Sequence, residues 1–346
     1  MSLPEVPSGV RPVVGDHLSH IAIPARTRQW RQVANFAAVA GRRARSHAPV
    51  LPEAPDYRKL FVVGCGRSGT SWVQGIIAAH PRVITTQESH AYEAVYDPVT
   101  RRSAASLNAW TKVLHRHDLS EREARWVGLH WWINRADLLD LVDWGLHSGL
   151  IGDDDAAESV IEAIFDTYFV SRGGTADNML LEKTPGHIAY AQQILRRFPD
   201  ARVVEVLRDG RDVCVSMQMQ GLTVSWPPES RRAQINTWAR AARRGLALRA
   251  DPELADRVHL VRYEELKRDP EPEIARLFEF VGLDATSGFV AEVADASDFR
   301  HHRTTGAGKH TRRGEVGDWR NHFSTADEEM FRELAGDVFE AVGYEL

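Results

Sequence analysis

The sequence predicts an α/β fold, built on a doubly wound, mostly parallel sheet with a helical insertion. Two observations predict it. Short apolar runs rich in β-branched residues alternate along the chain with segments of helical spacing, and the first run ends in a glycine-rich turn. Parallel strands need crossover connections, which are usually helices, so this alternation favours a parallel sheet over a series of hairpins.

The predicted elements follow in order from residue 58. The first apolar run, KLFVVG, is continuous, as in a strand that is buried on both faces. Strands are expected at residues 59–64, 82–88 and 201–209, at residues 178–185, where the strand leads into a helix, and at residues 257–266, where the strand is followed by its exit loop. Helices are expected at residues 70–80, 187–198 and 272–283, and another begins at residue 211. A tryptophan-rich stretch of helical pattern, at about residues 100–175, is expected to be an insertion in one domain that spans residues 58–346.

Residues 1–57 are expected to form an arm in front of this domain. Prolines mark both ends of the arm, and no acidic residue lies between Asp16 and Glu53, a stretch that contains several arginines. We expect a solvated arm that packs on the domain. Contact of this basic arm with a membrane surface, a partner subunit or an anionic molecule stays open.

The overall composition argues against several classes of protein. A net charge of -5 disfavours a dedicated nucleic-acid binder, whose surface would be basic. The sequence has no run of about 18 uncharged apolar residues and no secretory signal pattern, so we expect a cytoplasmic protein without a transmembrane segment. Cys65 and Cys214 lack metal-ligand spacing and are expected to be buried thiols.

The strongest local motif is FVVGCGRSGTSW, at residues 61–72. Its glycines let the backbone approach an anion closely, and the helix that follows offers unpaired N–H groups at its N-terminus. Ser68, Thr70 and Ser71 add hydroxyl donors, so the sequence predicts a phosphate-binding loop. The loop differs from that of nucleoside triphosphatases, which ends in Gly-Lys-Ser/Thr, because its only cation is Arg67.

GCGRSGTSW resembles the 5'-phosphosulfate loop of sulfotransferases that use 3'-phosphoadenosine 5'-phosphosulfate (PAPS). Its Arg-Ser-Gly-Thr form is most similar to that of the tyrosylprotein sulfotransferases and related bacterial enzymes. The resemblance implies that Arg67 holds the transferring sulfonate and that Trp72 stacks on the adenine. It assigns donor binding to Gly66, Arg67, Ser68, Gly69, Thr70, Ser71 and Trp72.

A second segment, LRDGRDVCVSM, resembles the 3'-phosphate motif of the same family. Arg208 stands at a strand end and Ser216 follows eight residues later on the next helix, which is the family's spacing. A guanidinium suits a phosphate because its planar fork donates two parallel hydrogen bonds. Taken alone, Arg208 would equally fit a surface ion pair with Asp209 or Asp212.

Two more segments carry the resemblance toward the C-terminus. RRGEVGDW resembles the family's Arg-Lys-Gly...Gly-Asp-Trp segment, which implies 3'-phosphate contacts from Arg312, Arg313 and Gly314 and an anchor at Trp319. RYEEL resembles a family segment whose tyrosine borders the nucleotide. Tyr263 is therefore expected either as a ligand or as a core residue.

Sulfuryl transfer needs a base for the acceptor, a cation at the transferring group and help for the leaving oxygen. The resemblance to the tyrosylprotein branch places the base at Glu88, with His90 as its rival. Lys183 resembles the strand-end lysine that these families direct at the bridging oxygen. Glu182 is expected as a second site carboxylate or as an ion-pair partner. No metal is expected, because arginine and lysine supply the positive charge.

The sequence therefore predicts a sulfotransferase that moves the sulfuryl group of PAPS to a hydroxyl or amine acceptor and releases adenosine 3',5'-bisphosphate. The tryptophans of the insertion fit a pocket for a small aromatic, sugar or lipid acceptor, although helix packing explains them equally well. Two alternatives remain. A nucleotide-dependent kinase would need the missing Gly-Lys-Ser/Thr, and an inactive PAPS-binding protein would not need Arg67, Glu88 and Lys183 together.

Overall fold

The computed structural model of the chain describes residues 54–85, 88–89, 91–92, 161–162, 165–166, 168–170, 172–221, 228–298 and 314–346. The chain divides into two compact units, one of Arg58–Thr85 with Asn178–Leu346 and one of Met1–Tyr57 with Thr86–Asp177. Most of the expected arm and of the expected insertion lies outside the described residues. In the second unit, Tyr57 stacks on Phe169 with ring centroids 3.8 Å apart and donates a hydrogen bond of 2.7 Å to Asp166.

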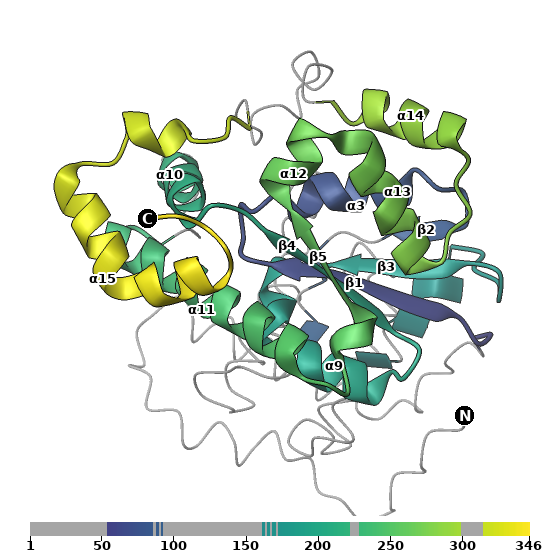
Figure 1. Ribbon diagram of the computed structural model, residues 1–346. Helices are drawn as coiled ribbons and strands as arrows, with labels where there is room; N and C mark the ends of the chain where they lie inside the picture. Colours follow the sequence, from purple (N-terminus) through teal and green to yellow (C-terminus); the bar gives the residue numbers. More distant parts are fainter. Residues whose placement is uncertain are drawn as a thin grey trace, which may run out of the picture. The chain divides into compact units, whose positions relative to one another are not determined.

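The first unit is built on a five-stranded sheet with the order β2-β3-β1-β4-β5. Every neighbouring pair is parallel, as the sequence predicts. The sheet is the twisted layer at the centre of Figure 1, with β1 in the middle of the order. Its strands are β1 (Arg58–Gly64), β2 (Val83–Thr85), β3 (Met179–Lys183), β4 (Arg202–Leu207) and β5 (Val258–Arg262).

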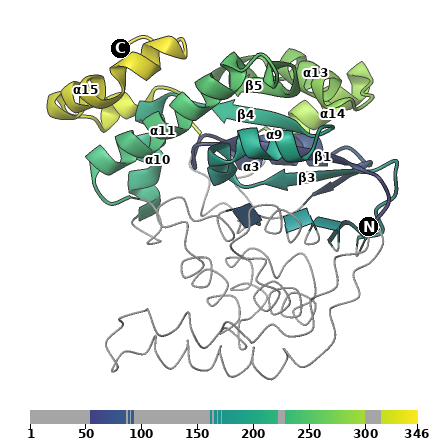
Figure 2. The same cartoon turned by 90° about the horizontal axis from the view of Figure 1, so that it is seen from below.

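Helices cover both faces of this sheet (Figures 1 and 2). On one face, Leu60 and Val62 of β1 pack with Val204 and Val206 of β4 in a core that the helices of that face complete. These helices are α3 (Thr70–Ala78), α12 (Tyr263–Arg268), α13 (Pro270–Val281) and α14 (Ser287–Ala296). The opposite face packs on η2 (Pro185–Ala189), α9 (Ala191–Arg197) and α11 (Arg231–Ala250).

A second core joins α10 (Gly210–Gly221), α11 and α15 (Thr325–Ala341) beside the carboxyl ends of β1 and β4. Trp238 of α11 lies at its centre and is fully buried. Cys65 and Cys214 are both buried in this core, which confirms the expectation for the two thiols. Burial raises the pKa of Cys214 to about 12 and raises that of Cys65 as well, so both stay protonated at neutral pH.

The structure also departs from the predicted elements. The second strand ends at Thr85, earlier than the predicted residue 88. The predicted helix at 187–198 is a 3₁₀ turn followed by α9, and the sequence analysis did not predict α11, α14 or α15. Local start signals mark these helices, since Ser230 caps α11 and Ser324 forms a capping box with Asp327 at the start of α15. None of the helices in the described ranges is long and apolar enough to cross a membrane.

Candidate functional site

Many of the residues singled out by sequence lie at the carboxyl edge of the sheet. Because all five strands are parallel, their carboxyl ends lie along the same edge. β1 leads into the glycine-rich loop, β3 ends at Lys183, Arg208 follows β4, and Tyr263 follows β5. β1 lies between β3 and β4, where the strand order reverses, and ligands of doubly wound sheets bind at this position.

The loop between β1 and α3 has a backbone that depends on glycine at two positions. Gly64 has a φ of 147°, and a Cβ there would lie 2.5 Å from the carbonyl oxygen of Val206. Gly69, the N-cap of α3, has a φ of 101°, and a Cβ there would lie 2.6 Å from the ring of Tyr263. Arg67 also has a positive φ, of 76°, which is costly for a residue with a side chain. The loop thus wraps tightly around the N-terminus of α3.

Side chains of the loop connect it to two neighbouring elements. Ser71 accepts a hydrogen bond of 3.1 Å from Nζ of Lys183, at the end of β3. Arg67 donates through Nε to Oγ of Ser216 on α10, at 3.1 Å. Ser68 is only 1% exposed, and its Oγ has no hydrogen-bond partner among the described residues. Gly66 and Thr70 complete the turn.

Arg208 lies in the interior beside the loop. It is 8% exposed, so it is not the surface residue that a simple ion pair would need. Its Nη2 donates to the carbonyl oxygen of Glu315 at 2.9 Å and lies 3.8 Å from the carboxylate of Asp212. Its Nε is buried without a partner in the described ranges. The carbonyl oxygen of Arg208 accepts a hydrogen bond of 3.0 Å from the indole of Trp238.

Tyr263 connects the loop to Arg208 and to the C-terminal segment. Its ring is buried against Gly69, and the Arg208 guanidinium lies 4.4 Å from the ring centroid. Its hydroxyl donates to the carbonyl oxygen of Gly314 at 2.9 Å. The ring of Trp72 meets it edge-on at 5.4 Å, and the Trp72 indole donates to the carbonyl oxygen of Ser297. Tyr263 is thus a core residue that borders the loop.

Asp212 attaches the C-terminal segment to the start of α10. Its carboxylate accepts backbone hydrogen bonds from Gly317 at 2.8 Å and from Trp319 at 2.9 Å. Burial raises the pKa of Asp212, and the two backbone bonds and the positive charge of Arg208 act in the opposite direction. We call Arg208, Asp212, Tyr263 and the segment 314–319 the clasp.

The structure brings most of the predicted donor residues together, but not all of them are described. The loop, Lys183, Arg208, Ser216, Tyr263 and Gly314 belong to one compact unit. Arg312, Arg313 and His90 lie outside the described residues. Glu88 belongs to the other unit and lies outside helices and strands.

Glu182 has a structural partner. It is buried directly before Lys183, accepts a hydrogen bond of 2.6 Å from Thr184 and lies 2.9 Å from Nδ1 of His187. Of the two expectations for Glu182, the structure therefore shows a side chain that pairs with other protein groups, Thr184 and His187.

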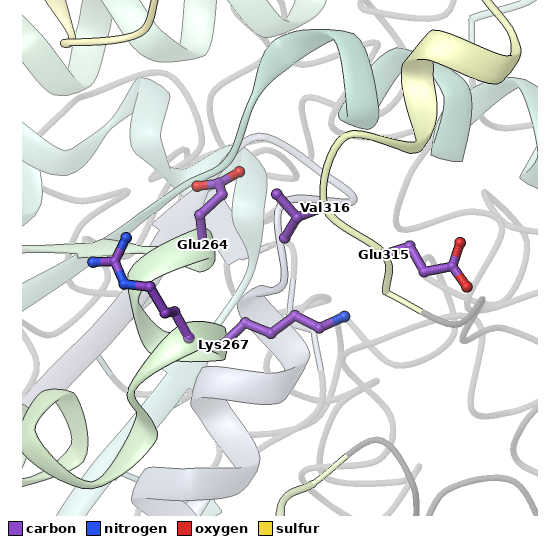
Figure 3. Close-up of a pocket in the computed structure, with 5 residues that line it drawn as sticks. Glu264, Lys267, Glu315 and Val316 are labelled. Carbon is purple, nitrogen blue, oxygen red and sulfur yellow. The ribbon is translucent and has the colours of Figure 1, made fainter.

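A cavity of about 460 Å³ adjoins the clasp (Figure 3). Three of its lining residues come from α12, and Lys267 extends from that helix toward the segment that carries Glu315 and Val316. Glu264 is held by the backbone N–H of Asp209 and the hydroxyl of Tyr344. Sequence reasoning missed Lys267 and Trp238, and it considered Asp212 only as an ion-pair partner.

No group of three His, Cys, Asp or Glu side chains that could hold a metal ion is present in the ranges that the structure describes. The cations of the site are arginine and lysine. Two of them, Arg208 and Lys183, are buried. Positively charged side chains at this edge of the sheet can pair with an anion.

A family model described as "Sulfotransferase family" matches residues 59–287, more than half of the chain. Protein-tyrosine sulfotransferase 1 of Danio rerio is 25% identical over 229 residues, which are 66% of this chain and 54% of that protein. Sulfotransferase 1C2 of Homo sapiens is 30% identical over 87 residues, which are 21% of this chain and 29% of that protein. The chain thus spans less than two thirds of the length of either relative.

A solved structure shows the same fold. The crystal structure of sulfotransferase STF9 from Mycobacterium avium matches with a TM-score of 0.51 and 16% sequence identity. The match covers 96% of this chain and 90% of that chain.

Proposed function

The chain belongs to the sulfotransferase family, and on that premise we propose that it transfers the sulfuryl group of PAPS to a hydroxyl or amine acceptor. The observation that carries the proposal is the pair of buried, unpartnered donors at one sheet edge. Ser68 Oγ and Arg208 Nε have no hydrogen-bond partner among the described residues. Buried polar atoms are rarely left unpaired, so both fit a ligand that accepts hydrogen bonds.

The residues present fit a nucleotide with phosphate groups at both its 5' and 3' positions. The N-terminus of α3 and the hydroxyls of Ser68, Thr70 and Ser71 would hold the 5' group. Arg208 and Ser216 would hold the 3'-phosphate, together with Arg312, Arg313 and Gly314. Trp72 would contact the adenine, and Tyr263 would border it. No resident metal is part of the proposal.

When bound, PAPS supplies a sulfuryl group that is activated by its phosphate leaving group. Lys183 would stabilise the negative charge on the leaving oxygen, from its position at the end of β3 beside Ser71. Arg67 would do the same for the equatorial oxygens of the transferring group. Glu88 would accept the proton of the acceptor hydroxyl or amine, which requires a carboxylate that is ionised before the reaction.

The acceptor is proposed more coarsely than the donor. Protein-tyrosine sulfotransferase 1 acts, by its name, on tyrosine in proteins, so a phenolic hydroxyl is one acceptor class. The tryptophans at about residues 100–175 would also suit an aromatic, sugar or lipid acceptor. Because of these tryptophans, the insertion is our candidate for the acceptor pocket.

A donor assay tests the proposal directly. The protein is incubated with a library of phenol, sugar and amine acceptors and with either ³⁵S-labelled PAPS or γ-³²P-labelled ATP. Label should move from PAPS alone, because the loop lacks the Gly-Lys-Ser/Thr of kinases. Transfer from ATP would favour the kinase alternative, and PAPS binding without transfer to any acceptor would favour the inactive binding protein.

A further inference from the structure

The carbonyl oxygen of Gly314 is held by two side chains of α12. The hydroxyl of Tyr263 donates to it at 2.9 Å, and Nζ of Lys267 donates to the same oxygen. The carbonyl oxygen of the next residue, Glu315, accepts a hydrogen bond from Arg208. Three donors thus fix two consecutive peptide groups, and the chain reaches these groups directly after Arg312 and Arg313.

Lys267 occupies this position against an electrostatic cost. Burial lowers its pKa, and the positive charge of Arg208 lowers it further, while Glu315, Asp298 and Asp212 act in the opposite direction. An ammonium placed near a guanidinium is repelled by it. The bond to a neutral carbonyl offsets part of this cost, and a bound anion beside Arg208 would offset more.

We propose that Lys267 is a positioning residue for the 3'-phosphate of the nucleotide. By holding the Gly314 carbonyl together with Tyr263, it keeps Gly314 and Glu315 in place beside Arg208. This inference rests on the proposed function and adds a residue to it. Lys267 acts through Gly314, so its loss should weaken recognition of the 3'-phosphate and leave recognition of the 5'-phosphate unchanged.

The experiment compares Lys267→Met with Arg268→Met. Both variants remove one positive charge from α12, and both residues line the cavity of Figure 3. Dissociation constants are measured by calorimetry for adenosine 3',5'-bisphosphate and for AMP, which lacks the 3'-phosphate. Lys267→Met should weaken binding of the bisphosphate by about tenfold and change AMP binding by less than about twofold. Arg268→Met should leave both constants unchanged.

A second variant tests the route through Gly314 and covers the case in which Lys267→Met does not fold. Tyr263→Phe keeps the ring against Gly69 and removes the hydroxyl that donates to Gly314. Tyr263→Phe should also weaken binding of the bisphosphate and leave binding of AMP unchanged. In the double variant the loss should differ from the product of the two single losses, because both donors act on one carbonyl.

Several results would overturn the inference. An unchanged bisphosphate affinity in Lys267→Met, an equal loss for AMP, or a strictly multiplicative double variant would each show that Lys267 does not position Gly314 for recognition of the 3'-phosphate. Failure of the proposed function looks different. In that case the unmodified protein would bind the bisphosphate no better than AMP.

Discussion

The two ends of the candidate donor site are assembled in different ways. The loop end, residues 64–72 with Lys183, is made from consecutive residues and the end of one neighbouring strand. It keeps Ser68 Oγ buried and unpartnered within the described ranges. The clasp end is made from hydrogen bonds between residues far apart in the sequence: Tyr263 and Gly314 are 51 residues apart, and Arg208 and Glu315 are 107 apart.

This difference suggests that the loop end and the clasp contribute to different steps, the first to sulfuryl transfer and the second to nucleotide binding. Each end keeps one buried donor without a partner among the described residues, Ser68 Oγ at the loop end and Arg208 Nε in the clasp. Arg67 and Lys183, the cations proposed for the chemistry, stand at the loop end. At the clasp end, hydrogen bonds from Arg208 and Tyr263 to carbonyl oxygens and from Gly317 and Trp319 to the Asp212 carboxylate hold the segment in place, so this end is organised in advance around the Nε of Arg208. Changes at the loop end or at the base should therefore lower turnover, whereas changes in the clasp should lower affinity.

The largest expected effect tests the chemical side of this comparison. Glu88→Gln keeps the size and hydrogen-bonding shape of the side chain but removes its ability to take a proton. Turnover should fall by about 10²–10⁴-fold, the usual contribution of general base catalysis, while affinity for adenosine 3',5'-bisphosphate should stay within about twofold. Steady-state sulfation and calorimetry measure the two quantities.

His90→Ala is the matched control for this prediction. It removes the rival base two residues away and should leave turnover within a few-fold. An active Glu88→Gln together with an inactive His90→Ala would move the base to His90. The assignment of the donor site would be unaffected.

The next effect tests the clasp. Arg208→Lys keeps the positive charge but removes the planar fork and the contact of the guanidinium with the Tyr263 ring. Affinity for the bisphosphate should fall by about 10- to 100-fold, because hydrogen bonds to charged groups are lost, and AMP affinity should change little. Turnover at saturating PAPS should fall by less than the affinity does. A loss confined to turnover would contradict the division between the two ends.

The same difference explains how much of the site the sequence could predict. The strand, the glycine loop and the helix that follows are neighbours along the chain, so Arg67, Ser68 and Trp72 could be located from one local motif. The partners of Asp212 are 105 and 107 residues away, and no local pattern predicts a contact at that distance. Trp238 was missed for a related reason. Its helix, α11, was not predicted, because the apolar face of that helix includes alanine and glycine, which give a weak hydrophobic signal among many arginines.

In the fold, too, features set by neighbouring residues could be predicted and features set by distant residues could not. The parallel order of the strands could be inferred because β-strands alternate with crossover helices. The length of β2 could not, since β2 is an edge strand of the described sheet and its paired strand, β3, comes about a hundred residues later in the chain. The start of α15 carried a usable signal, Ser324 with Asp327 three residues on, which is a capping box.

The smallest expected effect separates ligand binding from stability at the loop end. Ser68→Ala removes a buried hydroxyl that has no partner in the described part of the chain. The free energy of unfolding should stay the same or rise by up to about 1 kcal/mol, because an unsatisfied polar group leaves the interior. Affinity for the bisphosphate should nevertheless fall by about three- to tenfold, because the hydroxyl is proposed to donate to the ligand.

Ser324→Ala is the opposite control. It removes the cap of α15, which should cost about 1 kcal/mol of stability and leave nucleotide affinity unchanged. Urea denaturation and calorimetry measure both quantities for both variants. If Ser68→Ala lowers stability and spares affinity, the hydroxyl supports the fold, and the loop end is not kept open for an anion.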